Sequence, residues 1–584
     1  MAVLMLGLGV GVNTTVFCWL QTSVLHPLPG VSDSSRVKAL IQADGSGTLS
    51  SRVSYPDFRD LAGLKQVFSG VIGTSPAEVI LGINGRNEWV NARVATASTF
   101  AVLGVNPEYG RSFVPDEDQG EGGHPIILVS HRLWKSEFGG KASAVGSAVR
   151  LNQQLFTVVG VLPPEFHSVV GGAQVDVWAP LSMHEAVLNY GSYASRSFRW
   201  IQPLARLRPG VGELQAGAAL ATLSSQLQQA YAESNRGVHF ELFPLWKSPF
   251  AGQAQFMPVL RILLAVSLGV LLIVAVNISC LLLARGAARE KEIAVRVAIG
   301  AGRWRLVRQM LTESLLLAGF GGCLAWCVAL FGVRLLAGFV LRASGGCGYP
   351  FRLDIGTLAF LLLLTALIAV LFGLVPALRS SRTGFLEGLK AGRGSSLGLS
   401  HHRTLQLLVG SEMAIALVLL IAAGLCLRGF GRARHLDLGF NPHDVLYARL
   451  NLVPNNYSAQ RAREFDQALR SRLTAVPDMA NAAFVNTAPL GPGGTFSGTV
   501  DVPGHTAAGN ENRLVSFIIA SPGYFDVLRT PILSGRDFSD ADDQTRSNVA
   551  IINQVWRGII GRDSIPSAGN FVWRWASRRP TALP

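Results

Sequence analysis

Long apolar runs that no charged residue interrupts are the clearest pattern along this chain. Three of them cover residues 262–284, 314–333 and 355–378, and each has arginine at or near at least one end. A helix needs about 20 residues to span the hydrocarbon core of a bilayer. Each run is too long for a buried strand, so we predict transmembrane helices at 259–284, 312–341 and 355–378.

Two further runs predict additional membrane helices, at 1–25 and 404–428. The first carries no charge, and Gly7, Gly9 and Gly11 would allow close helix contact. Its alternative interpretation is a secretory signal peptide. It has neither a basic start nor a small-residue cleavage site, so we favour an uncleaved helix. The whole pattern predicts an α-helical membrane protein with about five transmembrane helices.

Two polar side chains fall inside the predicted spans, Asn277 and Glu412. An ionisable residue in a span is a functional candidate by default. Glu412 lies only about two helical turns from a basic loop, by the helical repeat. It could reach water or Arg403 there, so a paired or snorkelled carboxylate is an equally good interpretation.

Residues 26–258 have a different pattern, with short β-branched runs separated by glycine and proline. Residues 126–129 and 156–161 read as strands, whereas 98–103 and 131–138 read as short helices. This segment therefore predicts a mixed α+β domain.

An internal repeat shows that this domain occurs twice. The pattern of Phe100, Leu103, Gly110, Arg111 and Phe113 recurs at an offset of 425 as Phe525, Leu528, Gly535, Arg536 and Phe538. We therefore predict a second copy of the domain at 429–584. It is expected to be incomplete, because nothing after Trp556 matches the strand and prolines at 156–164.

Composition and charge support the membrane assignment and set its orientation. Hydrophobic residues make up 49% of the 584 residues and charged residues only 15%, with a net charge of +14. The segments 285–311 and 379–403 carry +9 of that charge. Both follow apolar runs, which predicts cytoplasmic loops, with 26–258 and 429–584 outside, and argues against nucleic-acid binding.

The sequence holds no recognisable catalytic or metal-binding pattern. It has no G-x-x-x-x-G-K-[ST] phosphate-binding loop and no H-E-x-x-H zinc motif. Residues 394–398 fit G-x-S-x-G but lie in a Gly/Ser-rich linker instead of the strand–turn–helix that a nucleophile requires. We therefore predict no enzymatic activity, no bound cofactor and no metal.

The basic segment 285–311 has amphipathic character. Glu292 and Arg296 lie four residues apart, which places them on one helical face, and the glycines beginning at Gly300 break the pattern. Such a segment can dock on a partner protein. It can also lie on anionic membrane lipid, and the residues alone leave both open.

Several runs resemble the MacB/FtsX-type permeases of ABC transporters. They are residues 6–14 (LGLGVGVNT), 26–29 (HPLP), 277–285 (NISCLLLAR), 289–296 (REKEIAVR) and 298–301 (AIGA). The duplicated arrangement is similar to that of the duplicated permeases of acidobacteria. The chain departs from that pattern at both ends, which suggests truncation: a basic stub before the first span and a final set of spans are expected but absent.

The resemblance implies a permease in the inner (plasma) membrane with MacB-like extracytoplasmic core domains. A separate ABC ATPase subunit would bind ATP and dock on the loop that contains Arg289, Glu292, Arg296, Gly300 and Arg303. A homo- or heterodimer and a periplasmic adaptor fit the same pattern, and export is the expected function. The alternatives are an FtsX-like signalling permease that regulates cell-wall hydrolases, or a truncated fragment without function.

Overall fold

The computed structural model describes most of the chain as two units. The described residues are 2–45, 47–83, 85–169, 174–249, 252–288, 303–343, 353–382, 397–450, 459–477, 479–489, 496–501, 514–542, 549–556 and 572–574. One unit comprises residues 1–29, 168–173 and 249–436, and the other comprises 30–167, 174–248 and 437–584. The first consists mainly of long helices, and the second contains all the described β-strands.

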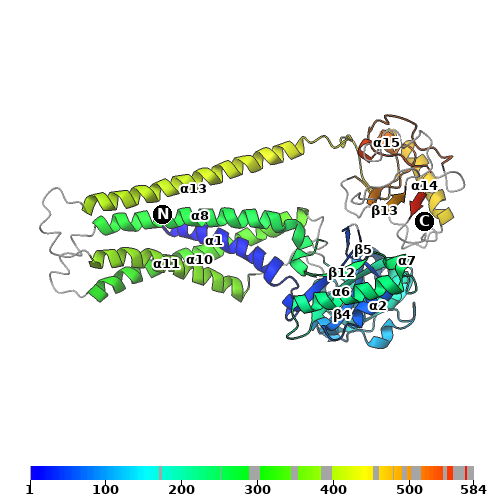
Figure 1. Ribbon diagram of the computed structural model, residues 1–584, viewed down its shortest axis with the longest axis horizontal. Helices are drawn as coiled ribbons and strands as arrows, with labels where there is room; N and C mark the ends of the chain where they lie inside the picture. Colours follow the sequence, from blue (N-terminus) through cyan, green and yellow to red (C-terminus); the bar gives the residue numbers. More distant parts are fainter. Residues whose placement is uncertain are drawn as a thin grey trace. The chain divides into compact units, whose positions relative to one another are not determined.

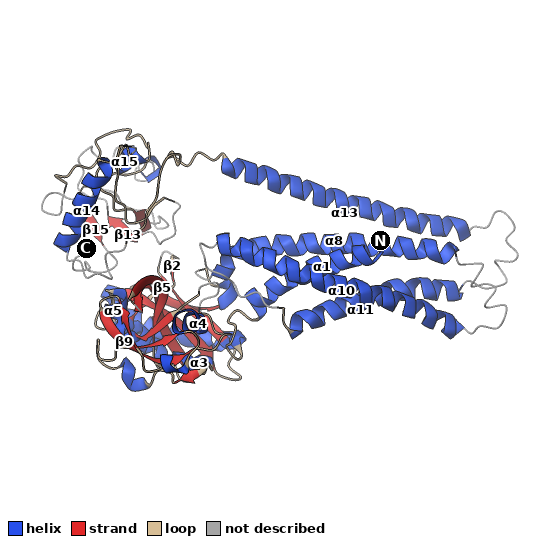
Figure 2. Cartoon of the chain, turned by 180° about the vertical axis from the view of Figure 1, so that it is seen from behind, coloured by secondary structure: helices blue, strands red, loops and turns tan. Residues whose placement is uncertain are grey.

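Five long helices form the first unit. They are α1 (Ala2–Leu20), α8 (Gly252–Ala288), α10 (Arg303–Ala343), α11 (Ile355–Arg382) and α13 (Leu397–Arg434). Figures 1 and 2 both show α1 lying among α8, α10 and α11. Four of the five, α11 excepted, contain stretches that are long and apolar enough to cross a membrane, and the apolar part described in α11 is residues 355–368.

Long helices extend into both predicted cytoplasmic segments. At 285–311, for which the sequence indicated amphipathic helical character, α8 continues to Ala288 and α10 begins at Arg303. In the same way, α11 and α13 extend into the predicted linker 379–403. The physical reason is that arginine, leucine and glutamine are good helix formers, so a helix need not end where the charged residues begin.

The β-rich part of the second unit is a 12-stranded sheet at 37–244. Its strands are β1 (Val37–Ala43), β2 (Leu49–Ser50), β3 (Val53–Ser54), β4 (Phe68–Ile83), β5 (Arg86–Ala95), β6 (Tyr109–Gly110), β7 (Ile126–Val129), β8 (Ala148–Leu151), β9 (Gln154–Val161), β10 (Val177–Pro180), β11 (Arg199–Leu207) and β12 (His239–Pro244). The main order is β12-β1-β11-β4-β5-β10-β7-β9-β6. The pairs β5–β10 and β7–β9 are parallel, whereas the other pairs are antiparallel.

Helices cover this sheet because their apolar residues face it. They are α2 (Tyr55–Ala62), α3 (Thr99–Leu103), α4 (His131–Phe138), α5 (His184–Leu188), α6 (Glu213–Ala230) and α7 (Ala232–Asn235). Phe58, Leu133 and Leu220 from three of them join one core with the strands. The predicted helix at 131–138 is confirmed, and the Ser130 hydroxyl caps it by accepting from the Leu133 amide at 3.1 Å.

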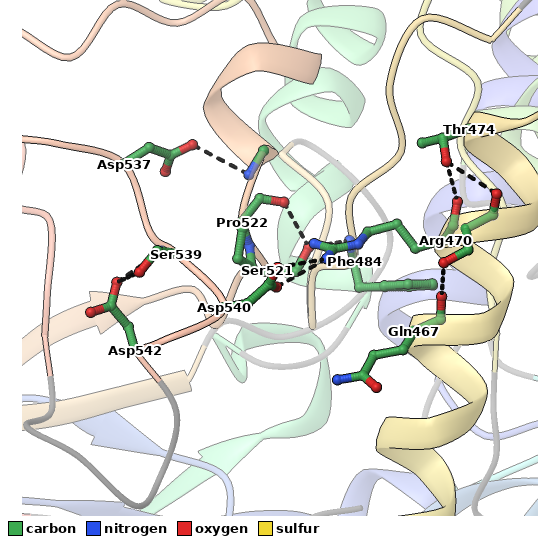
Figure 3. A network of polar contacts seen from close by, with 12 residues as sticks. Gln467, Arg470, Thr474, Phe484, Ser521, Pro522, Asp537, Ser539, Asp540 and Asp542 are labelled. Carbon is green, nitrogen blue, oxygen red and sulfur yellow. Dashed lines mark hydrogen bonds and ion pairs between the residues drawn. The ribbon is translucent and has the colours of Figure 1, made fainter.

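A smaller set of elements lies beyond residue 458. They are α14 (Ala459–Thr474), β13 (Phe496–Asp501), β14 (Leu514–Phe517), α15 (Tyr524–Val527) and β15 (Val572–Arg574), with the strand order β14-β13-β15. Figure 3 shows the Arg470 guanidinium of α14 donating to both carboxylate oxygens of Asp540, at 2.9 and 3.2 Å. This ion pair ties α14 to the loop that follows α15.

The internal repeat recurs in the structure as a matched set of contacts. In the first copy Arg111 donates to Glu117 at 2.7 Å, and Glu117 also accepts from the Val114 amide at 2.7 Å. At the same offset of 425, Arg536 donates to Asp542 and Asp542 accepts from the Ser539 amide at 2.8 Å. Figure 3 shows the Ser539 and Asp542 side chains together. The repeat therefore preserves an arginine–carboxylate ion pair along with its apolar residues.

The stability of the first domain should depend on the titration of Asp118. Burial raises the pKa of this carboxyl to about 6, although it accepts a hydrogen bond from the Ala97 amide at 2.6 Å. A carboxyl whose pKa is higher in the folded state than in the unfolded state stabilises the fold at low pH. That contribution is lost as the pH rises through about 6.

We predict that Asp118→Asn changes the pH dependence of thermal unfolding in the full-length protein. The unfolding free energy of the variant minus that of the wild type should be about 1 kcal/mol larger at pH 7.5 than at pH 5. Tryptophan fluorescence at the two pH values measures this difference. If the unfolding free energy of the variant minus that of the wild type is the same at both pH values, Asp118 is not the responsible group.

Candidate functional site

The sequence-predicted coupling residues fall at the edge of the described structure. Arg289, Glu292, Arg296 and Gly300 lie outside the described residues, and Arg303 is the first residue of α10. Their role stays a prediction. The candidate site that the structure does describe is the set of contacts that α1 makes within the helical unit.

The two predicted intramembrane polar residues lie on other helices of this unit. Asn277 is half-buried on α8, and Glu412 is half-buried on α13. Glu412 lies within electrostatic range of Cys280, which is also on α8. The structure therefore brings Glu412 close to α8, but it places neither residue in the contacts described next.

Glycines on α1 allow two neighbouring helices to approach closely, as the sequence predicted. A Cβ atom at Gly7 would lie 2.5 Å from the Leu324 side chain of α10. One at Gly9 would lie 2.9 Å from Val274 of α8, and one at Gly11 would lie 2.7 Å from Val328 of α10. Gly7 and Gly11 are one helical turn apart and face α10, whereas Gly9 faces α8. This is the small-residue packing that membrane helices use.

Asn13 adds a polar contact on the face of α1 that meets α8. Its side-chain amide donates to the Ser267 carbonyl at 2.8 Å and to the Gly9 carbonyl at 2.9 Å, and the residue is buried. Asn13 and Gly9 are one turn apart, so a hydrogen bond between helices lies beside the close contact of Gly9 with Val274. Polar side chains hold membrane helices together in this way.

Near the end that leads to the core domain, α1 makes a polar contact with α11. The Gln21 amide donates to Asp354 at 2.6 Å, and its oxygen accepts from the Thr357 hydroxyl at 3.1 Å. Asp354 also accepts from the Thr357 amide at 2.9 Å, so it caps the first turn of α11. We call Gln21, Asp354 and Thr357 the polar clasp.

The surroundings of the polar clasp fit the Gln21 side chain closely. Gln21 and Thr357 are buried, whereas Asp354 is exposed. A Cβ atom at Gly356 would lie 2.7 Å from the Gln21 amide nitrogen, so a larger residue there would displace the Gln21 side chain. One turn before Gln21, Phe17 stacks on Phe360 of α11 with ring centroids 3.9 Å apart.

The helix changes its hydrogen-bond pattern at the polar clasp. Residues Gln21–Leu25 form a π-helical segment, η1, in which the His26 amide donates to the Gln21 carbonyl at 2.8 Å. Short π-helical turns are rare, and those that do occur are often found at functional sites. Here the segment lies between the last α-helical turn of α1 and the chain that enters the core domain.

These contacts are steric contacts and hydrogen bonds between helices. Among the described residues no group of three or more His, Cys, Asp or Glu side chains could hold a metal ion. Sequence reasoning recognised the glycines but missed Asn13 and the polar clasp. The signal that could have found them was present, because Asn13 and Gln21 are amide side chains within an uncharged, largely apolar run.

Comparison with protein families identifies two domains in the chain. Residues 1–228 match the MacB-like periplasmic core domain, and residues 264–385 match the FtsX-like permease C-terminal domain. The first match includes α1 and most of the 12-stranded sheet, and the second includes most of α8 and all of α10 and α11.

Individual relatives agree with these domains. The macrolide export ATP-binding/permease protein MacB of Bdellovibrio bacteriovorus is 24% identical over 392 residues, which cover 66% of this chain and 56% of that protein. The uncharacterised ABC transporter permease YknZ of Bacillus subtilis is 22% identical over 342 residues, covering 57% of this chain and 77% of that protein. The chain thus spans about half the length of the MacB relatives it matches.

Solved structures also match part of the chain. The periplasmic region of MacB from Actinobacillus actinomycetemcomitans matches at 16% identity with a TM-score of 0.28, covering 37% of this chain and 91% of that one. The extracellular domain of YknZ matches at 12% identity with a TM-score of 0.27, covering 35% of this chain and 98% of that one.

The glycine contacts of α1 can be tested by adding side chains. We predict that Gly9→Leu destabilises the helical unit by about 1–3 kcal/mol, because the new side chain overlaps Val274. Gly319→Leu on α10 is the matched control, since a Cβ there meets nothing within 4 Å. Its effect should stay within about 0.5 kcal/mol in thermal unfolding of the detergent-solubilised protein. Equal effects of both substitutions would contradict the packing described for α1.

The polar clasp can be tested with a double-mutant cycle. Gln21→Leu and Asp354→Ala should show a coupling free energy of about 0.5–3 kcal/mol, because each removes the hydrogen bond between Gln21 and Asp354. Gln21→Leu combined with Asp116→Asn, an exposed carboxylate of the core domain, is the control pair and should be additive within about 0.5 kcal/mol. Additivity in the first cycle as well would mean that Gln21 and Asp354 do not interact.

Proposed function

We propose that this chain, which is an ABC transporter permease of the MacB and FtsX type, carries movement from a separate ATPase subunit to its extracytoplasmic core domain and so drives export. The observation that carries this proposal is the position of α1. It packs against α8, α10 and α11 through its glycines, Asn13 and the polar clasp. It then continues through η1 into the domain that begins at residue 30.

ATP would be bound by the partner ATPase, and this chain would need no cofactor of its own. The sequence contains no phosphate-binding loop, which supports this division of labour. The names of the MacB relatives combine an ATP-binding part with a permease part, and this chain matches about half of their length. An inner-membrane location, a dimer and an adaptor at the extracytoplasmic side belong to the same proposal.

The ATPase would dock on the basic segment between α8 and α10. Movement of that segment shifts both helices, and α1 follows because its glycines leave no gap into which α8 or α10 could slide. At the other end of α1, the polar clasp links η1 to the start of α11 through hydrogen bonds. Substrate leaves from the extracytoplasmic side, and the described residues do not define its chemical class.

The docking part of this proposal predicts a loss of partner binding. Reversing the charge at Arg296 and Arg303 should weaken association with the ATPase subunit at least about tenfold, or about 1.4 kcal/mol, while membrane insertion remains normal. The control reverses Arg208 and Arg236, two exposed arginines of the core domain. Co-purification with the ATPase measures both variants. The same experiment should find no ATP hydrolysis by the permease alone and hydrolysis by the complex.

Two results would overturn the proposal. If the Arg296/Arg303 variant binds the ATPase as well as the wild type does, the segment contacts lipid and is not a docking element. If the permease hydrolyses ATP in a preparation free of the partner, the energy source lies within this chain.

A further inference from the structure

A buried histidine lies at the start of a short helix of the core domain. His184 is the first residue of α5, and it is the one histidine among the described residues that is fully buried. Apart from a weak interaction with the Leu181 carbonyl, neither of its ring nitrogens has a hydrogen-bond partner in the described part of the chain. Burial lowers the pKa of the imidazole, because a charge on it would lie in apolar surroundings. The ring is therefore neutral in the folded domain at neutral pH.

Aromatic rings and a close stretch of backbone surround this imidazole. Its ring centroid lies 4.9 Å from that of Trp200 on β11 and 5.0 Å from that of Tyr193. Tyr193 also stacks on Tyr55 of α2, with centroids 3.9 Å apart. A Cβ atom at Gly191 would overlap the imidazole, so the backbone there lies against the ring. Gly191 and Tyr193 both belong to the loop 189–198, which joins α5 to β11.

Ion pairs at its far end hold the loop 189–198 on the domain. The Arg196 guanidinium donates to the carboxylates of Asp57 and Asp60, each at 2.7 Å. It also lies 3.8 Å from the centre of the Tyr231 ring. The middle of the loop is held differently, because the Tyr193 hydroxyl is buried and has no hydrogen-bond partner among the described residues. Burying a polar group without a hydrogen bond costs free energy, so opening the loop would regain hydration at Tyr193 and at the imidazole.

We propose that His184 and the loop 189–198 form a pH-sensitive switch in the first core domain. The loop stays closed over the neutral imidazole, and it opens when the imidazole takes up a proton. A charged ring is poorly accommodated in this stack, whereas water solvates it once the loop has moved away. Acidity outside the membrane would thereby change the conformation of the extracytoplasmic domain.

The titratable groups that face the imidazole are few. Tyr193 contacts it from the loop, and two exposed carboxylates lie within electrostatic range, Glu121 before β7 and Glu185 on α5 itself. The carboxylates favour protonation of the ring, but burial is the larger effect and opposes it. Trp200, from β11, does not titrate, and among the described residues β4 and β5 contribute none of the groups that shift the pKa of the ring.

The sign of the pH effect follows from the lowered pKa. A histidine whose pKa is lower in the closed state than in the open state stabilises the closed state at neutral pH. That contribution is lost as the pH falls through the ordinary histidine value of about 6.5. Asp118 acts in the opposite direction, since its raised pKa stabilises the fold at low pH. Opening on acidification therefore cannot come from Asp118.

Hydrogen exchange of the full-length protein in detergent tests the switch without the ATPase, and this inference does not rest on transport. Exchange of the amides in 189–198 is measured at pH 7.5 and pH 5 and corrected for the intrinsic pH dependence of exchange. Their protection should fall about tenfold at pH 5, because an exposed histidine is then mostly charged. The amides of β11 should keep their protection, which distinguishes opening of the loop from unfolding of the domain.

Substitutions identify the titrating group. His184→Phe should retain the aromatic contacts and abolish the pH response, and His184→Gln replaces it if the phenylalanine variant does not fold. Arg196→Gln should reduce protection of the loop at both pH values, because it removes the ion pairs and not the titrating group. His239→Gln is the matched control, a partly exposed histidine of β12 beside Glu241, and should keep the full pH response.

Three results would overturn the switch. The first is equal protection of the loop at both pH values in the wild type. The second is a wild-type pH response in the His184 variants. The third is an equal loss of protection in β11, which would mean that the whole domain unfolds.

Discussion

The close approach of α1 to its neighbours is the interaction on which the rest of the helical unit depends. In a bilayer, apolar side chains gain little by leaving lipid for another helix, so association relies on tight packing and on polar links between helices. One helix supplies both here. Gly7 and Gly11 admit α10, Gly9 admits α8, and Asn13 bonds to the Ser267 carbonyl. A larger side chain at any of these glycines would separate α1 from the helices that enclose it.

Local signals in the sequence predicted much of the architecture. The apolar runs gave the long helices, and β-branched runs gave strands such as β7 at Ile126–Val129. Contacts between distant residues were not predictable in the same way. Gln21 and Asp354 are 333 residues apart in the sequence. The sequence around either residue does not indicate the other as its partner. A hydrogen bond between helices depends on how the helices are rotated and on how far along their axes they meet, and not on a periodic pattern.

The two copies of the core domain show which interactions the repeat has retained. Both copies keep a residue with a left-handed backbone conformation after the short helix. It is Gly104, with a φ of 69°, in the first copy and Arg529, with a φ of 53°, in the second. Both also keep the arginine–carboxylate ion pair, although a glutamate at 117 is replaced by an aspartate at 542. The surrounding core is less similar, since Phe100 is fully buried and packs edge-on against Trp178, whereas most apolar residues described around α15 are more exposed. Local turn geometry and a charged contact within one loop therefore persist where long-range packing differs.

The contacts of α1 also differ in how easily they can be exchanged, and this difference determines where the unit can move. At the glycines the contact is steric, so α8 and α10 cannot slide along α1 without overlap between side chains and backbone. At the polar clasp the contact is a set of hydrogen bonds, and Asp354 is exposed. Exchanging a hydrogen bond for one with water changes the free energy by only about 0.5–1.5 kcal/mol. Relative movement of α1 and α11 is therefore least costly beside η1, the segment whose hydrogen-bond pattern already departs from an α-helix. Under the proposed function, a helix that is rigid against α8 and α10 and adjustable beside η1 would carry a displacement from one end of the unit to the other.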